Sequence, residues 1–119
     1  MGPYAYSTFN VRLDTIQKDP ELVRGFVRGM MKSLKFVHDN HDEAAEIAKT
    51  QFPTMALDDL KATLARSFAD DMWSQDGTIS PAAWDTAKAV VMGAGILKVD
   101  VKYDEIIDMS FVNSLNATL

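Results

Sequence analysis

The sequence predicts a mainly helical fold in which an N-terminal strand is followed by four to six helices. Two observations carry this prediction. Apolar and polar residues alternate over the first part of the chain, which is typical of a strand. From residue 19 onward, apolar residues recur every three or four positions, and residues that start or end helices interrupt the pattern. The single domain, 1–119, is therefore divided into a strand region, 1–16, and a helical part, 19–119.

The strand is predicted from the segment YAYSTFNVRL at residues 4–13. Phe9, Val11 and Leu13 fall on one face of an extended chain, and the polar residues Thr8 and Asn10 fall on the other. A single strand is not stable without a neighbour to pair with. No second long strand is predicted, so we expect the fold to be incomplete on its own.

The first long helix is predicted to open at the Asp-Pro-Glu sequence at 19–21, with Asp19 as N-cap and Pro20 in the first turn. Its apolar residues continue at helical spacing to Val37. Asn40 is predicted to cap the next helix, with Glu43 three residues later as in a capping box. Pro53 ends that helix.

A third helix is predicted from the helical spacing of Leu57, Leu60, Leu64, Phe68 and Met72. Ser80-Pro81 is predicted to start a fourth helix, which Gly95 ends. Beyond it, apolar residues at 96–101 indicate a short extended segment, and two short helices are expected at 103–107 and 108–115.

Charge and composition exclude several classes of function. The chain has 12 lysines and arginines against 17 aspartates and glutamates, a net charge of -5, which argues against nucleic-acid binding. The basic residues along the first long helix are predicted to form a solvated face: Arg24, Arg28, Lys32 and Lys35. With no cysteine present, disulfides, thiolate metal sites and cysteine nucleophiles are excluded. No apolar run approaches the length of about 20 residues that spans a membrane.

The stretch WSQDGTISPAAW at 73–84 contains the centre of a calcium-loop sequence, Asp76-Gly77. If Gly77 is the sixth position of such a loop, Met72 and Ala83 occupy the first and twelfth, where calcium needs carboxylates. We therefore predict a turn with a positive-φ glycine, followed by Ser80 as the cap of the next helix.

Two other polar groups are interpreted as structural. His38 and His41 lie beside acidic residues, but a helix break at Asn40 separates them, so a polar helix–helix corner is favoured over a metal site. Asp70 and Asp71 are neighbours on a helix and diverge by about 100°, so they cannot share a proton as a catalytic pair. We predict no metal, no cofactor and no catalytic residue.

One polar and aromatic cluster is suited to holding a small ligand, because tyrosine offers a flat apolar face with a hydrogen-bonding tip. The candidate substrate-binding residues are Tyr4, Tyr6, Ser7 and Thr8. The alternative is an edge strand that carries ordinary tyrosines.

Taken in order, these elements resemble the C-terminal portion of ABC-transporter solute-binding proteins of the nitrate, sulfonate, taurine and thiamine-pyrimidine-precursor family. The motifs that carry the resemblance are Asp19-Pro20-Glu21, residues 42–45, Gly77 before Gly95-Ile96-Leu97, and Asp108, Ser110 and Phe111 near the end. The resemblance covers nearly the whole chain. Family members are longer and fold into two α/β lobes, the type II fold of periplasmic binding proteins. The resemblance therefore implies that this chain is a C-terminal fragment.

The resemblance implies a function in transport rather than catalysis. The parent protein would capture a small solute between its lobes and deliver it to an ABC permease, in the periplasm or anchored by lipid outside the cell. The residues Met1-Gly2-Pro3-Tyr4 are not a signal peptide, so any export signal is expected upstream. By the same resemblance, residues 4–8 would lie where the family's hinge and cleft meet. Helices that normally cover a sheet would be exposed, so we expect a homo-oligomer, with the N-terminal strand exchanged between chains.

Two alternatives remain open from the sequence. The first is a pyrimidine-precursor synthesis enzyme of the same fold, whose chemistry would need a histidine and a cysteine-rich site. The second is a free-standing helical interaction module, which would be monomeric and would bury its own helices.

Overall fold

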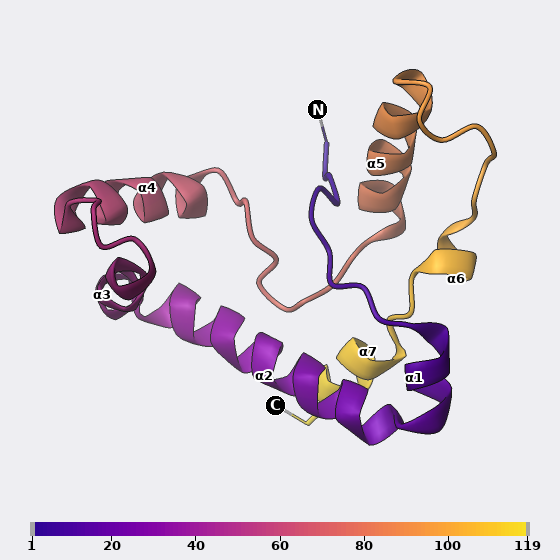
Figure 1. Cartoon of the computed structure of the whole chain (residues 1–119), viewed down its shortest axis with the longest axis horizontal. Coiled ribbons are helices and arrows are strands. Elements are labelled where there is room, and N and C mark those ends of the chain that lie inside the picture. The colour runs from indigo at the N-terminus through magenta and orange to yellow at the C-terminus, as the bar shows by residue number, and fades with distance from the viewer. Residues whose placement is uncertain (1, 119) are drawn as a thin grey trace. The chain divides into compact units, whose positions relative to one another are not determined.

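The computed structural model describes residues 2–118, and in that range it contains seven helices and no strand (Figure 1). The mainly helical prediction is therefore confirmed. The helices are α1 (Leu13–Lys18), α2 (Pro20–Asp39), α3 (His41–Gln51), α4 (Leu57–Ala69), α5 (Pro81–Gly93), α6 (Tyr103–Ile106) and α7 (Ser110–Asn116). They form two compact units: unit 1 comprises residues 2–26 and 78–118, and unit 2 comprises residues 27–77.

The predicted N-terminal strand is not formed. Residues 2–12 have no regular secondary structure, and the end of the predicted strand region 1–16 belongs to α1 instead. An extended segment becomes a strand only when a neighbour bonds its N–H and C=O groups, and none does so within residues 2–118. Helix α1 has Asp14 in its first turn and Lys18 in its last, the charges that suit the helix dipole. The expected extended segment at 96–101 forms no strand for the same reason.

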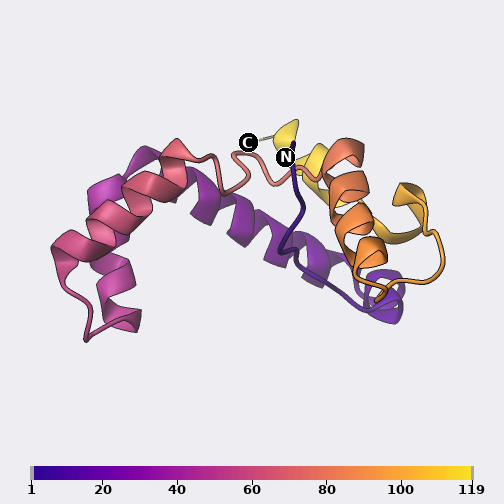
Figure 2. The same cartoon turned by 90° about the horizontal axis from the view of Figure 1, so that it is seen from above.

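In unit 2, α3 and α4 lie side by side in both views (Figures 1 and 2). Small buried residues of α3, Ala44 and Ala45, let the two helices approach, and Leu60 of α4 is buried beside them. The buried Ser67 hydroxyl donates to the Thr63 carbonyl oxygen at 3.0 Å, so burying it leaves no unpaired polar group. An ion pair also joins the helices, with 3.1 Å between Lys61 Nζ and Asp42 Oδ1.

The corner between α2 and α3 differs from its prediction in one respect. Asn40 does not cap α3 with its side chain; its amide Nδ2 instead donates to the Phe36 carbonyl oxygen of α2 at 3.0 Å. The predicted capping box of Asn40 and Glu43 is therefore wrong. An asparagine between two helices can satisfy either the last carbonyls of the first or the first N–H groups of the second, and here it does the former.

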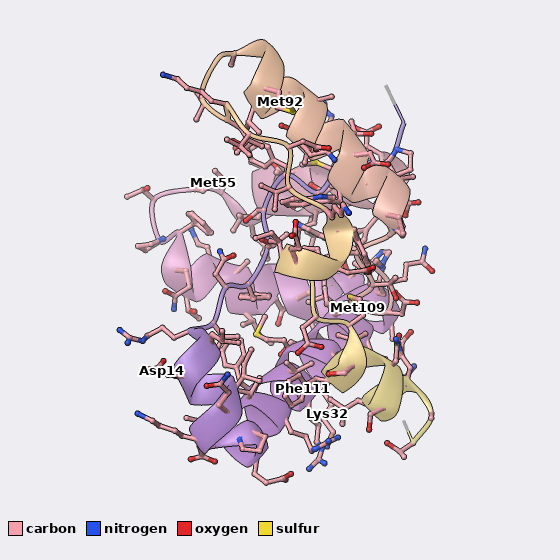
Figure 3. All side chains as sticks on the ribbon, turned by 90° about the vertical axis from the view of Figure 1, so that its right-hand side faces the viewer. Asp14, Lys32, Met55, Met92, Met109 and Phe111 are labelled. Carbon is pink, nitrogen blue, oxygen red and sulfur yellow. The ribbon has the colours of Figure 1, made fainter. Side chains whose placement is uncertain are left out.

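In unit 1, the start of α2 is formed as predicted, because Asp19 Oδ1 accepts a hydrogen bond from the Leu22 N–H at 3.1 Å. Val23 of α2 is buried, as are Phe111 (labelled in Figure 3) and Leu115 of α7. Arg24 joins the same two helices. Its Nη1 donates to Ser114 Oγ at 3.0 Å, and its guanidinium carbon lies 5.7 Å from the centre of the Phe111 ring.

Both predicted ends of α5 are confirmed. Ser80 Oγ accepts from the Ala83 N–H at 3.1 Å, and Pro81 occupies the first turn. Gly95 ends the helix with φ +73°, a conformation that glycine adopts without strain. Two side-chain hydrogen bonds then hold the segment that follows α5. Trp84 Nε1 of α5 donates to the Val101 carbonyl oxygen at 3.3 Å, and the Tyr103 hydroxyl donates to the carbonyl oxygen of Ile79, just before α5, at 2.6 Å.

Candidate functional site

The candidate ligand-binding residues lie in unit 1, in the segment that precedes α1. The Tyr4 and Tyr6 rings contact each other with centroids 5.8 Å apart and planes tilted by 59°. A tight turn brings them together, because the Tyr6 N–H donates to the Tyr4 carbonyl oxygen at 2.9 Å. Tyr6 is 83% exposed and Tyr4 is 37% exposed, so the pair presents open aromatic surface.

Ser7 and Thr8 follow the tyrosine pair along the same segment. Ser7 is exposed at a bend, and Thr8 is half-buried, with its carbonyl oxygen accepting from Asn10 Nδ2 at 3.4 Å. The segment is held in place by its backbone, since the Ala5 N–H donates to the Ala83 carbonyl oxygen in the first turn of α5 at 3.1 Å. This geometry supplies two exposed aromatic faces with hydroxyl groups close by in the sequence.

The predicted turn between α4 and α5 is confirmed. Gly77 has φ +82°, its N–H donates to Ser74 Oγ at 2.8 Å, and the same hydroxyl lies 3.4 Å from Asp76 Oδ1. The Ser74 hydroxyl and Asp76 carboxylate are thus engaged within the turn itself. Over residues 2–118, no group of three or more histidine, aspartate or glutamate side chains is placed to hold a metal ion.

The two histidines form part of an aromatic cluster that the sequence analysis missed. His41 stacks on Phe68 with centroids 3.7 Å apart and planes 8° from parallel, and His38 lies 5.4 Å from the same ring. The Trp73 ring contacts the Phe68 ring edge-on, with centroids 5.4 Å apart. His38 Nε2 lies 3.3 Å from the Ser74 carbonyl oxygen, and a hydrogen bond there requires the proton on Nε2. The predicted polar corner is therefore packed against α4 through stacked rings.

Asp70 and Asp71 lie beyond the last residue of α4 rather than on the helix. Both are exposed, and Asp71 has φ +54°, the left-handed conformation that aspartate tolerates better than most residues. The backbone N–H of each residue donates to a carbonyl of the last turn, at 2.9 Å for Asp70 and 3.1 Å for Asp71. The pair therefore ends α4.

Lys88 forms the most connected charged group in unit 1. Its Nζ lies 2.8 Å from Asp100 Oδ1, 3.7 Å from Asp85 Oδ1 and 3.4 Å from the Val101 carbonyl oxygen. The hydrogen bond to Asp100 raises the pKa of the Lys88 ammonium and lowers the pKa of the Asp100 carboxyl. This cluster joins α5 to the segment before α6. The three-residue spacing on α5 could indicate the contact with Asp85, but not the contacts with Asp100 and Val101.

Two open hollows lie at the α2–α3 corner of unit 2. One, of about 440 Å³, is formed by residues 38–43 of the corner itself. The other, of about 340 Å³, is lined by Lys32, Ser33, Phe36 and Val37 of α2 and by Ala44 and Ile47 of α3. The second hollow is mainly apolar in its lining side chains, with Lys32 at its edge.

Comparison with protein-family models, with curated proteins and with solved structures gave no match. No helix of residues 2–118 combines the length and the apolar character needed to cross a bilayer.

Proposed function

We propose that this chain is the C-terminal part of a solute-binding protein of an ABC importer, whose two α/β lobes capture a small molecule and deliver it to a permease. The parent protein works in the periplasm or lipid-anchored outside the cell, and it has no catalytic role. Tyr4, Tyr6, Ser7 and Thr8 contribute to the solute site at the edge of the cleft. The remaining solute contacts come from the rest of the parent protein.

The observation that carries the proposal is the scarcity of core in each unit. Among the large apolar side chains of its described residues, unit 1 buries only Val23, Phe111 and Leu115. Unit 2 buries only Met31 and Leu60 among its own. Other large apolar side chains are exposed instead. In unit 1 they include Phe9, Leu13, Leu22, Phe26 and Ile96, and in unit 2 they include Phe52, Met55 and Met72. This balance of few buried and many exposed apolar side chains is what the proposal expects of helices that another part of a larger fold covers.

The local structures at the motif residues support the same proposal. Asp19 caps a helix that begins with Pro20, Gly77 forms a turn, and Gly95 ends the helix that follows it. Near the end, Asp108 Oδ1 accepts from both the N–H and the hydroxyl of Ser110, at 2.9 Å and 2.6 Å, where α7 begins. These start and stop signals occur in the order that characterises the C-terminal helices of the family.

Calorimetry tests the proposal on the full polypeptide of the open reading frame that contains this chain, and on this chain alone. The probes are nitrate, taurine, an alkanesulfonate and an aminomethyl-pyrimidine. We expect the full polypeptide to bind one of them with one-to-one stoichiometry and the chain alone to bind none. A reading frame without a second lobe, no binding of any probe to the full polypeptide, or tight binding to the chain alone would each overturn the proposal.

The contribution of the tyrosines is tested in the full polypeptide. We expect Tyr6→Ala to weaken solute binding by about tenfold, which corresponds to about 1.4 kcal/mol. Tyr6→Phe, which keeps the aromatic face, is the matched control and retains most of the affinity if the ring makes the contact. Unchanged affinity in Tyr4→Ala and Tyr6→Ala would remove these residues from the site.

The alternative of a free-standing helical interaction module has one observation in its favour, the absence of strands in residues 2–118. The same calorimetric experiment distinguishes it, because a module of this kind binds no solute in either polypeptide.

A further inference from the structure

We propose that the apolar hollow between α2 and α3 is an interface for a second copy of this chain, with α2 of each copy docked against α3 of the other. The inference concerns unit 2 alone and does not depend on the proposed function. It rests on the apolar surface of the hollow, on the charges along its two sides and on an open glycine position.

The hollow exposes large apolar side chains from both helices. Ile47 of α3 is 58% exposed and Phe36 of α2 is 36% exposed, and both line the hollow of about 340 Å³. Burying apolar area contributes about 25 cal/mol per Å², so covering these side chains favours association.

The charges beside these apolar residues have opposite sign on the two helices. Lys32 lies four residues before Phe36 and therefore one turn away on the same side of α2, with Arg28 one turn further back. On α3, Glu43 lies four residues before Ile47 and so borders the same surface. Within residues 2–118, Arg28, Lys32 and Glu43 form no ion pair. Each helix thus presents an apolar residue with an unpaired charge one turn away.

This arrangement is self-complementary. In a two-fold contact, each residue pair across the interface occurs twice, so a surface that carries both charges can pair with its own copy. Docking α2 on α2 of a second copy would bring like charges together at Lys32 and Arg28. Docking α2 on α3 instead brings Lys32 near Glu43 of the second copy and Phe36 near its Ile47. Charge complementarity therefore selects a second copy, in this pairing, over a partner of uniform charge.

Gly29 allows a close approach on the same side of α2. It precedes Ser33 by one turn, and a Cβ atom built on Gly29 meets no atom within 4 Å. A glycine inside a helix is about 1 kcal/mol less favourable than alanine. Nothing within unit 2 uses the space that the missing side chain leaves, whereas a helix of a second copy would.

Mixing of charge-reversed chains tests the proposal, with mass measured by size-exclusion chromatography and light scattering. We expect the natural chain to be a dimer. Lys32→Glu and Glu43→Lys should each raise the dimer dissociation constant by about tenfold or more, because each places two like-charge pairs in the interface. An equimolar mixture of the two variants should restore the dimer as a heterodimer. In that heterodimer the two substituted side chains face each other with opposite charges, and the natural Lys32 of one chain faces the natural Glu43 of the other.

The control is Lys98→Glu, which makes the same charge change at an exposed position of unit 1. It should leave the dimer unchanged, and circular dichroism should show equal helix content in all four chains. A monomeric natural chain, a dimer that survives both single reversals, or a mixture that does not associate would overturn the proposal. None of these results bears on solute binding by the full polypeptide, so failure here leaves the proposed function to its own test.

Discussion

Lys88 and Asp100 make the stability of unit 1 depend on pH. The hydrogen bond between them lowers the pKa of Asp100 and raises that of Lys88. A lowered carboxyl pKa contributes stability that is present above the unfolded-state value and is lost as the pH falls through the lower folded-state value. The raised pKa of Lys88 contributes stability at neutral pH that is lost only as the pH rises above its ordinary value of 10.5.

We therefore expect Asp100→Asn to be less stable than the natural chain at pH 7 and to approach it in stability as the pH falls below about 4. The measurement is urea unfolding between pH 7 and pH 2, followed by Trp84 fluorescence in a Trp73→Phe background. Asp104→Asn, at an exposed residue of the short helix α6, serves as the control for removing one carboxylate. Parallel pH profiles of Asp100→Asn and the natural chain would contradict this account.

The ring of Phe68 has the most aromatic neighbours in unit 2, where it stacks on His41 and contacts His38 and Trp73. Aromatic pairs contribute about 0.5–1.5 kcal/mol beyond the area that they bury. We expect Phe68→Leu to lower the free energy of unfolding by about 1–2 kcal/mol. The measurement is urea unfolding followed by Trp73 fluorescence in a Trp84→Phe background.

Phe52→Leu is the matched control for Phe68, since Phe52 is 54% exposed and has no ring contact within residues 2–118. Its effect should stay within about 0.5 kcal/mol. Equal losses in the two variants would mean that hydrophobic area, and not the stacked cluster, accounts for the effect.

Residues whose role is local were predictable from sequence, and those whose role is tertiary were not. Asp19 and Ser80 cap helices through N–H groups three residues away, so their neighbours alone decide the structure. The Asn40 side chain could bond either the end of α2 or the start of α3, and the neighbouring residues do not determine which of the two it bonds. His41 and Phe68 meet across two helices, so spacing along one helix could not indicate their stacking.

At the scale of elements, helix α5 depends on its cap because it has no buried residue of its own. Ser80 Oγ satisfies the Ala83 N–H, and replacing such a cap by alanine lowers stability by about 1 kcal/mol. We expect Ser80→Ala to lose about this amount of stability, measured by Trp84 fluorescence during urea unfolding in a Trp73→Phe background. Ser80→Asp keeps an acceptor at the cap and should retain most of the stability. A loss of equal size in both variants would exclude capping as its cause.

The N-terminal strand was predicted wrongly because a strand, unlike a helix, depends on a neighbouring strand. The alternation at residues 4–13 is real, yet a strand exists only when another strand accepts its hydrogen bonds, and residues 2–118 supply none. The helices required no such partner, because their backbone bonds close within each segment. For the same reason the positions of the caps were predictable, while the contact between the Tyr4 and Tyr6 rings was not.

At the scale of the whole molecule, stability should depend on protein concentration. Each unit buries few large apolar side chains, so association that covers the hollow between α2 and α3 would supply a substantial part of the stability. For a dimer that unfolds to two chains, a hundredfold rise in concentration increases the apparent free energy of unfolding by about 2.7 kcal/mol per dimer.

We expect the urea midpoint of the natural chain to rise across this hundredfold range, and that of Lys32→Glu to rise much less. Circular dichroism at 222 nm measures both midpoints without relying on either tryptophan, and Lys98→Glu provides a chain of the same net charge that should still respond to concentration. The comparison separates the interface from charge effects, because both variants change the net charge equally while only one changes the hollow. A midpoint of the natural chain that stays constant with concentration would mean that the exposed apolar side chains of unit 2 are not covered by a second copy.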